Sequence, residues 1–193
     1  MVCEDCLGLI IISIVSFIIG FILVKRYNNQ RNKFTLYMAV FFISAGIGWL
    51  VWFLSTEWVF DAYDSMRVYL VFIGIIPQLI LLYFILAFLD ISAYIRILII
   101  VVSLIFSIIH QFVPEYRIQT YVSTIIISLN IILFLLNWRR NNDIKSLGFS
   151  IGLLLILVAE ALSPVVKLLH GIFLIIAAII WGVTYSGIFE KEV

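Results

Sequence analysis

Charged residues are scarce in this chain. Of its 193 residues, 12% are Asp, Glu, Lys or Arg, whereas 65% are hydrophobic. A soluble domain with that composition would expose large apolar patches, which soluble monomers avoid. The composition therefore excludes a soluble domain and predicts an integral membrane protein. The net charge of +1 points to no nucleic-acid or strongly acidic partner.

Residues with catalytic or metal-binding chemistry are also few. The chain has two histidines and two cysteines, and it contains no His-Glu-x-x-His, no Gly-x-Ser-x-Gly and no phosphate-binding glycine loop. We therefore expect no catalytic activity, no cofactor and no metal site. Cys3 and Cys6 form a Cys-x-x-Cys without a nearby histidine, which provides too few ligands for zinc and leaves a short disulfide or two free thiols.

Long apolar runs, by contrast, are abundant. Between Arg67 and Asp90 lie 22 residues, interrupted only by Pro77-Gln78. Because ~20 apolar residues cross a ~30 Å hydrocarbon core, this run predicts a transmembrane helix. Pro77 removes the hydrogen bond to the carbonyl of Ile73, and in lipid that carbonyl needs another partner, from Gln78 or from a neighbouring helix. We therefore expect the run to lie inside a helix bundle, with Pro77 as a hinge.

Apolar runs separated by charged or turn-forming residues predict seven membrane spans. The fourth and sixth are the shortest. Ser163-Pro164 separates the last two, because a proline disfavours helix at the preceding residue and one helix across both would be about twice the length that a bilayer needs. The prediction is an all-α, single-domain membrane bundle over residues 1–193, with spans at about 7–24, 34–54, 68–89, 97–112, 118–136, 147–162 and 168–189.

Lys and Arg are distributed unevenly between the two sides that seven spans create. Nine lie in the loops after the first, third and fifth spans or in the C-terminal tail, and three lie on the other side. Loops rich in Lys and Arg stay in the cytoplasm, so we predict a cell-membrane protein with an extracytoplasmic N-terminus and a cytoplasmic C-terminus. The nine are Lys25, Arg26, Arg31, Lys33, Arg96, Arg139, Arg140, Lys145 and Lys191, and the three are Arg67, Arg117 and Lys167.

Several polar and aromatic residues fall within the predicted spans and are candidate ligand-binding residues. Most lie in the outer half, where they would line a pocket open to the outside with Glu160 as its charge. The alternative is that they form an interfacial belt, which is also rich in Trp. For the residue nearest the middle of its span, Gln78, the alternative role is to satisfy backbone freed by Pro77. The candidates are Trp49, Trp52, Gln78, His110, Glu160 and His170.

The two basic loops, Lys25–Lys33 and Trp138–Lys145, are candidates for docking an acidic lipid or partner, although membrane topology alone explains their charge.

The second, third and seventh spans resemble the seven-helix sensor region at the N-terminus of many prokaryotic histidine kinases. The resemblance lies in Ala45-Gly-Ile-Gly-Trp-Leu-Val-Trp52, in Asp61 to Arg67, in Tyr69 with Gly74 and Pro77, and in Tyr185-Ser-Gly-Ile-Phe189. It implies a sensor-like membrane bundle and covers nearly the whole chain. Such sensor regions continue into a linker and kinase, whereas this sequence ends at Glu190-Lys-Glu-Val193, so we expect no kinase here. We therefore expect a non-catalytic sensor-like or accessory subunit whose state a partner protein must detect.

A second resemblance favours a small carrier or channel for a polar solute. Pro77-Gln78 is similar to the proline-glutamine pair of PQ-loop type carriers, which have two three-helix repeats. Those carriers have the pair in the first helix of each repeat, whereas this chain has it once, in the third span. A weak internal echo links Ile10–Asn29 with Ile125–Asn142, which is typical of repeat-built transporters or a coincidence of two helices that both end on basic residues.

Gly148 and Gly152 lie four residues apart in the sixth span. Small residues at this spacing permit close helix packing in bilayers. We expect them either to bind a membrane partner or a second copy of the chain, with an event at Glu160 shifting that packing, or to seat the sixth span within its own bundle.

Overall fold

The computed structural model describes residues 5–56, 59, 62–113, 118–163 and 165–186. These residues form seven α-helices. Each helix is long and apolar enough to cross a membrane, so the predicted all-α class and the number of spans are confirmed. The helices are α1 (Cys6–Gln30), α2 (Lys33–Ser55), α3 (Tyr63–Phe88), α4 (Ala93–Phe112), α5 (Ile118–Asn141), α6 (Ile144–Leu162) and α7 (Lys167–Tyr185).

Several helices extend beyond the apolar runs that predicted them. Lys25 to Gln30 continue α1 past the apolar run, and the helix ends where Arg31 adopts a left-handed conformation with φ 54°. The predicted break between the last two spans is confirmed, since α6 ends at Leu162 and α7 begins at Lys167. The last predicted span ended at Phe189, but residues after Ser186 lie outside the described part of the chain.

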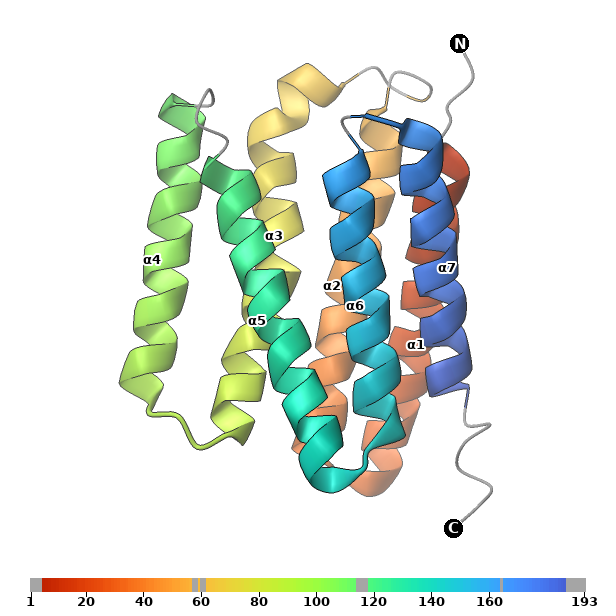
Figure 1. Ribbon diagram of the computed structural model, residues 1–193, viewed down its shortest axis with the longest axis vertical. Helices are drawn as coiled ribbons and strands as arrows, with labels where there is room; N and C mark the ends of the chain where they lie inside the picture. Colours follow the sequence, from red (N-terminus) through yellow and green to blue (C-terminus); the bar gives the residue numbers. More distant parts are fainter. Residues whose placement is uncertain (1–4, 57–58, 60–61, 114–117, 164, 187–193) are drawn as a thin grey trace.

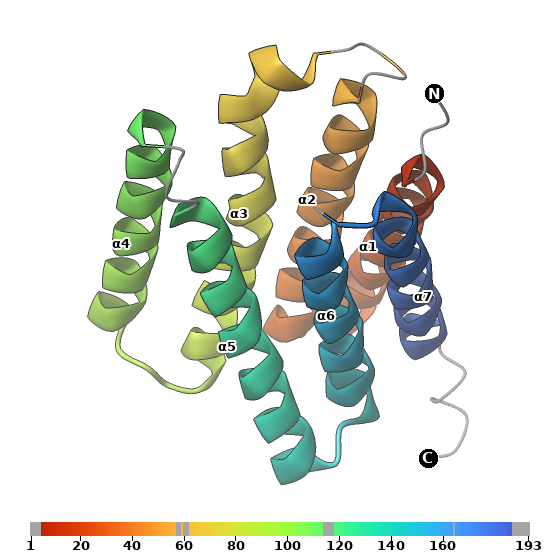
Figure 2. The ribbon, with the colours of Figure 1, turned by 45° about the horizontal axis from the view of Figure 1, so that its top comes forward.

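The helices run alternately up and down, and six of them close into a ring (Figure 1). Around the ring the order is α1, α2, α3, α5, α6 and α7, and α7 returns to α1. The remaining helix, α4, packs only on α3 and α5 among the closely packed pairs, and it stands at the edge of the bundle opposite α7 (Figures 1 and 2). The ring thus has α1–α3 on one half and α5–α7 on the other.

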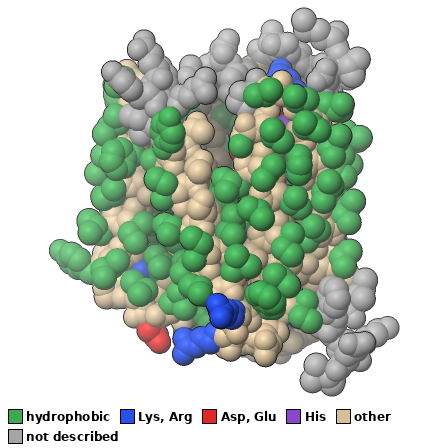
Figure 3. All heavy atoms as spheres, in the orientation of Figure 1, with side chains coloured by type: hydrophobic (Ala, Val, Ile, Leu, Met, Phe, Trp, Pro, Cys, Tyr) green, Lys and Arg blue, Asp and Glu red, His purple; other side chains and the backbone are tan. Residues whose placement is uncertain are grey.

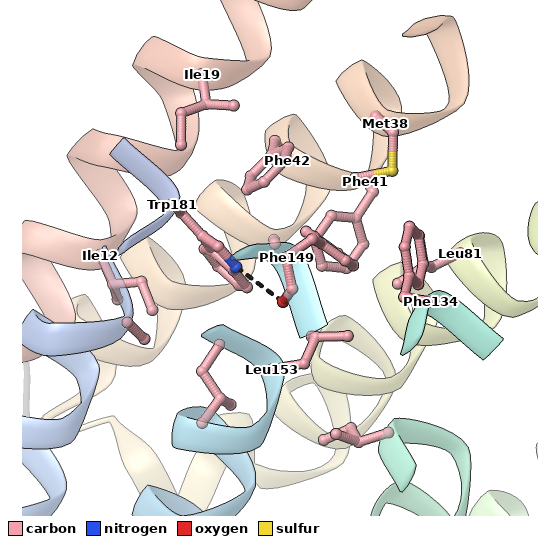
Figure 4. Packing of buried hydrophobic residues seen from close by; sticks show 14 of the residues in the cluster. Ile12, Ile19, Met38, Phe41, Phe42, Leu81, Phe134, Phe149, Leu153 and Trp181 are labelled. Carbon is pink, nitrogen blue, oxygen red and sulfur yellow. Dashed lines mark hydrogen bonds between the residues drawn. The ribbon is translucent and has the colours of Figure 1, made fainter. Parts of the chain in front are cut away.

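Aromatic side chains fill the centre of the ring. The rings of Phe149 on α6 and Trp181 on α7 stack with centroids 5.5 Å apart, and both meet Phe42 of α2 edge-on (Figure 4). Trp181 Nε1 donates a hydrogen bond to the carbonyl of Phe149 at 3.2 Å, which satisfies the buried indole N–H. The core therefore joins helices across the ring as well as around it.

The outer surface of the bundle is apolar. Exposed Leu, Ile, Val and Phe side chains occur on α1, α4, α5, α6 and α7, and in Figure 3 they cover the middle of the visible face, with most Lys and Arg gathered at the lower end. Such a surface is stable in contact with lipid tails and not in contact with water. The chain is a multi-pass membrane protein with seven candidate spans that contact the bilayer.

Candidate functional site

A hydrogen bond between Asp5 and His170 joins the start of α1 to the start of α7. Asp5 is the N-cap residue of α1, and its Oδ2 lies 3.3 Å from Nδ1 of His170, whose side chain is 2% exposed. An ionised carboxylate can only accept a hydrogen bond, so Nδ1 carries the proton. The imidazole Nε2 is buried and has no hydrogen-bond partner among the described residues.

Two glycines lie beside this contact, Gly8 three residues after Asp5 and Gly171 directly after His170. A Cβ at Gly8 of α1 would collide with the backbone of Gly171 on α7. Because both residues lack a side chain, the two helix backbones approach closely just below Asp5 and His170. The start of α1 therefore lies directly against the start of α7.

Glu160 completes a cluster of titratable groups at this end of the bundle. It lies in the last turns of α6, is half-buried and interacts electrostatically with His170. Lys167, exposed in the first turn of α7, interacts in the same way with Asp5. We call Asp5, Glu160 and His170 the α1–α6–α7 cluster. It brings together two of the predicted site residues, Glu160 and His170, and adds Asp5, which the sequence analysis missed.

The pKa of Asp5 lies below its ordinary value of 3.8. The main cause is the hydrogen bond from His170; the nearby charges of His170 and Lys167 add to it, and partial burial opposes it. The carboxylate is therefore ionised at neutral pH. The described residues contain no group of three or more His, Cys, Asp or Glu side chains placed to hold a metal ion.

Cys6 follows Asp5 of this cluster directly in the chain. Cys6 is disulfide-bonded, and its Sγ lies 4.0 Å from Oγ1 of Thr56 at the C-terminal end of α2. Cys3 lies outside the described residues.

Gln78 belongs to a separate polar contact between α3 and α5. Its side-chain Oε1 accepts a hydrogen bond from the Ser123 hydroxyl at 3.0 Å, and its backbone carbonyl accepts one from Asn130 Nδ2 at 3.4 Å. The side chain thus ties α3 to α5. The carbonyl of Ile73, which Pro77 leaves without its usual donor, lies beside Gly48 of α2, where a Cβ would stand 3.5 Å from the oxygen.

The other predicted site residues lie elsewhere. Trp49 and Trp52 are neighbours on α2, with ring centroids 6.3 Å apart, and both pack against the core. His110 is buried near the end of α4, at the opposite edge of the bundle from α7 (Figure 1). The structure therefore does not bring His110 together with Glu160 and His170. The outward-facing pocket stays a prediction.

Gly148 and Gly152 face α7 of the same chain. A Cβ at Gly148 would collide with Thr184, and one at Gly152 would collide with the indole of Trp181. Of the two roles that the sequence left open for these glycines, seating α6 within its own bundle is the one that the contacts favour. The space beside them is filled by α7, so a partner that docks on α6 must use other residues.

A polar cavity of about 220 Å³ lies at the opposite end of the bundle from the α1–α6–α7 cluster. Its walls come from α1, α2, α5, α6 and α7, and they include Arg26, Lys145 and Tyr185. A second cavity, of about 340 Å³, lies between α3 and α4 and has an apolar lining that includes Tyr83 and Leu104. None of the predicted site residues lines either cavity.

Comparison with known proteins gives no family for this chain: no family model matches it, and no curated protein or solved structure shows significant similarity to it.

Proposed function

We propose that this protein is a non-catalytic, sensor-like or accessory membrane subunit with an extracytoplasmic N-terminus and a cytoplasmic C-terminus. The excess of Lys and Arg at one end of the bundle supports the orientation, because positively charged loops remain in the cytoplasm. In this orientation the α1–α6–α7 cluster faces the outside. It is the responsive site of the proposed sensor.

The observation that carries the proposal is that His170 is hydrogen-bonded to one carboxylate, Asp5 of α1, and interacts electrostatically with a second, Glu160 of α6. The Asp5 carboxylate accepts the hydrogen bond from the Nδ1–H group of His170. A further proton that binds the imidazole must therefore bind at its buried Nε2. A charged imidazolium would be attracted by Asp5 of α1 and Glu160 of α6, and repelled by Lys167 of its own helix.

Protonation of His170 would therefore change how α1, α6 and α7 pack at their outer ends. Histidine is the side chain whose ordinary titration lies closest to neutral pH, so the signal that this geometry suits is extracytoplasmic acidity. Because the backbones of α1 and α7 touch at Gly8 and Gly171, a shift at the outer end of one helix would also move the other.

Hydrogen exchange tests this function. Wild type and His170→Gln are compared at neutral pH and at about pH 5.5, so that the intrinsic pH effect on exchange cancels between the two proteins. We expect acid to change protection in the first turns of α1 and α7 in wild type and not in the variant. His110→Gln removes the other histidine, on α4, and should respond as wild type does. An equal response in wild type and His170→Gln would contradict the proposal.

The helix order favours a second candidate, a small carrier for a polar solute. A half-turn about the axis of the ring places α1, α2 and α3 on α5, α6 and α7, with α4 outside as a connecting helix. This is the order expected of two three-helix repeats, and it pairs α1 with α5, the two helices that share the sequence echo. Uptake of polar solutes by purified protein in liposomes distinguishes the two functions, because a sensor subunit should give none above protein-free liposomes.

A further inference from the structure

The polar cavity at the basic end of the bundle has features that the sensor proposal does not use. Its lining residues come mostly from the ends of α1 and α7 and the beginnings of α2 and α6. Figure 1 shows these helix ends together at the lower side of the bundle. The volume of about 220 Å³ is below the roughly 300–1,000 Å³ of pockets for drug-sized ligands. It therefore suits a small ion or a single headgroup.

Two helix N-termini contribute to its wall. Asn32 caps α2 by accepting a hydrogen bond from the Phe34 N–H at 2.9 Å, and Asp143 caps α6 by accepting one from the Lys145 N–H at 3.1 Å. The N-terminus of a helix carries a partial positive charge and favours a nearby anion. With two helix N-termini at one cavity, their partial positive charges add.

Two cationic side chains line the same cavity. Arg26 comes from the last turns of α1 and Lys145 from the first turn of α6, and both are half-buried. The one carboxylate in the lining, Asp143, has both oxygens engaged: Oδ1 accepts from the Lys145 N–H, and Oδ2 accepts from the Ser146 hydroxyl at 2.7 Å. The described lining thus contains two cationic side chains and one carboxylate.

Tyr185 supplies the feature that points to a ligand. Its side chain is 5% exposed, lines the cavity and packs its ring edge-on against Phe42 at 5.1 Å. The charges of Arg26 and Asp143 act on its hydroxyl, yet no hydrogen bond joins that hydroxyl to another described residue. A phenol hydroxyl on a largely buried side chain at the cavity wall can donate a hydrogen bond to a ligand oxygen in the cavity.

We propose that this cavity binds a phosphate group. Arg26 is suited to a bidentate contact with phosphate oxygens, Lys145 to a point-charge contact, and Tyr185 to donating a hydrogen bond from the buried side. The phosphate has two possible sources, a free phosphate-bearing anion or the headgroup of an anionic lipid at the membrane surface. Both present the same chemistry to these residues.

Thermal stability and calorimetry in maltoside micelles, which contain no phosphate, test the site. Inorganic phosphate is titrated against sodium chloride of equal ionic strength, and phosphatidylglycerol is titrated in a parallel series. Saturable stabilisation by inorganic phosphate identifies a free anion, and saturation with phosphatidylglycerol alone identifies a headgroup. Either supports the proposal, whereas saturation with neither overturns it.

Variants show whether binding occurs at this cavity. Arg26→Gln, Lys145→Gln and Tyr185→Phe should each weaken the stabilising ligand by roughly tenfold or more, because each removes a charge-assisted hydrogen bond. Lys25→Gln removes a neighbouring exposed cation that does not line the cavity and should bind as wild type does. Tyr185→Phe keeps the packed ring, so it tests the site even where a charge variant does not fold. Equal weakening in Lys25→Gln and the cavity variants, or unchanged binding in Tyr185→Phe, would overturn the proposal.

Discussion

At the scale of single residues, Gly152 is where α6 and α7 depend on the absence of a side chain. We expect Gly152→Ala to destabilise the bundle by about 1–3 kcal/mol, because the added methyl collides with the buried indole of Trp181. Gly74→Ala is the matched control, since no atom lies within 4 Å of its Cβ position. The control should be neutral or stabilising by up to roughly 1 kcal/mol. Midpoints of thermal unfolding in detergent measure both, and equal midpoints would contradict the packing role.

Asp5 gives a pH dependence whose sign follows from its lowered pKa. The folded protein favours the charged carboxylate, so the unfolded chain takes up the proton first as the pH falls. The stability that Asp5 contributes is therefore fully present above its ordinary pKa of 3.8 and is lost as the pH falls through the lower pKa of the folded state.

Thermal unfolding of wild type and Asp5→Asn across this acid range measures the effect. The difference between their unfolding temperatures should shrink as the pH falls below about 4. A difference that stays constant would show that the Asp5–His170 hydrogen bond does not depend on the charge of Asp5.

At the scale of helices, the sequence predicted which segments cross the membrane but not where each helix ends. Apolar runs report the part of a helix inside lipid, whereas backbone hydrogen bonding carries α1 on through six polar and charged residues to Gln30. Asp5 was missed for a related reason. It precedes the first apolar run, and its role depends on His170, 165 residues away.

The expected hinge at Pro77 is a prediction at the scale of one helix, and the structure gives its surroundings. α3 continues through Pro77, and the carbonyl of Ile73 lies beside Gly48 of α2. We expect Pro77→Ala to restore the missing backbone hydrogen bond and to straighten or stiffen α3 while membrane insertion stays intact.

Distances between spin labels at the two ends of α3 measure this change. Ile76→Ala is the control, because it alters a 43% exposed side chain on the same turn and leaves the backbone hydrogen bonds unchanged. If Pro77→Ala and Ile76→Ala give the same distance distribution as wild type, the proline does not shape the helix.

At the scale of the whole molecule, the order of helices around the ring decides which residues meet. Hydropathy gives the number of spans, but it contains no information on which spans are neighbours. The phosphate cavity joins Arg26 and Tyr185, which lie at opposite ends of the chain, because α7 returns to α1. In the sequence, Arg26 and Lys145 appear only as parts of basic loops, whose charge membrane topology already explains. Tyr185 has no predicted ligand role, because the sequence does not show which side chains line a cavity.

The orientation of the bundle is the remaining whole-molecule prediction, and chemical labelling tests it directly. α1 begins at one end of the bundle and α7 ends at the other, so Cys6 at the start of α1 and the end of α7 face opposite sides of the membrane (Figure 1). Because Cys6 is disulfide-bonded, a membrane-impermeant maleimide should label it on intact cells only after mild reduction.

The control carries Cys3→Ser, Cys6→Ser and Asn29→Cys, which places the one thiol on an exposed residue at the basic end of α1. That thiol should react only after permeabilisation, because the nine Lys and Arg residues predict that this end faces the cytoplasm. The reverse pattern would place the α1–α6–α7 cluster in the cytoplasm and would remove it as a sensor of external acidity.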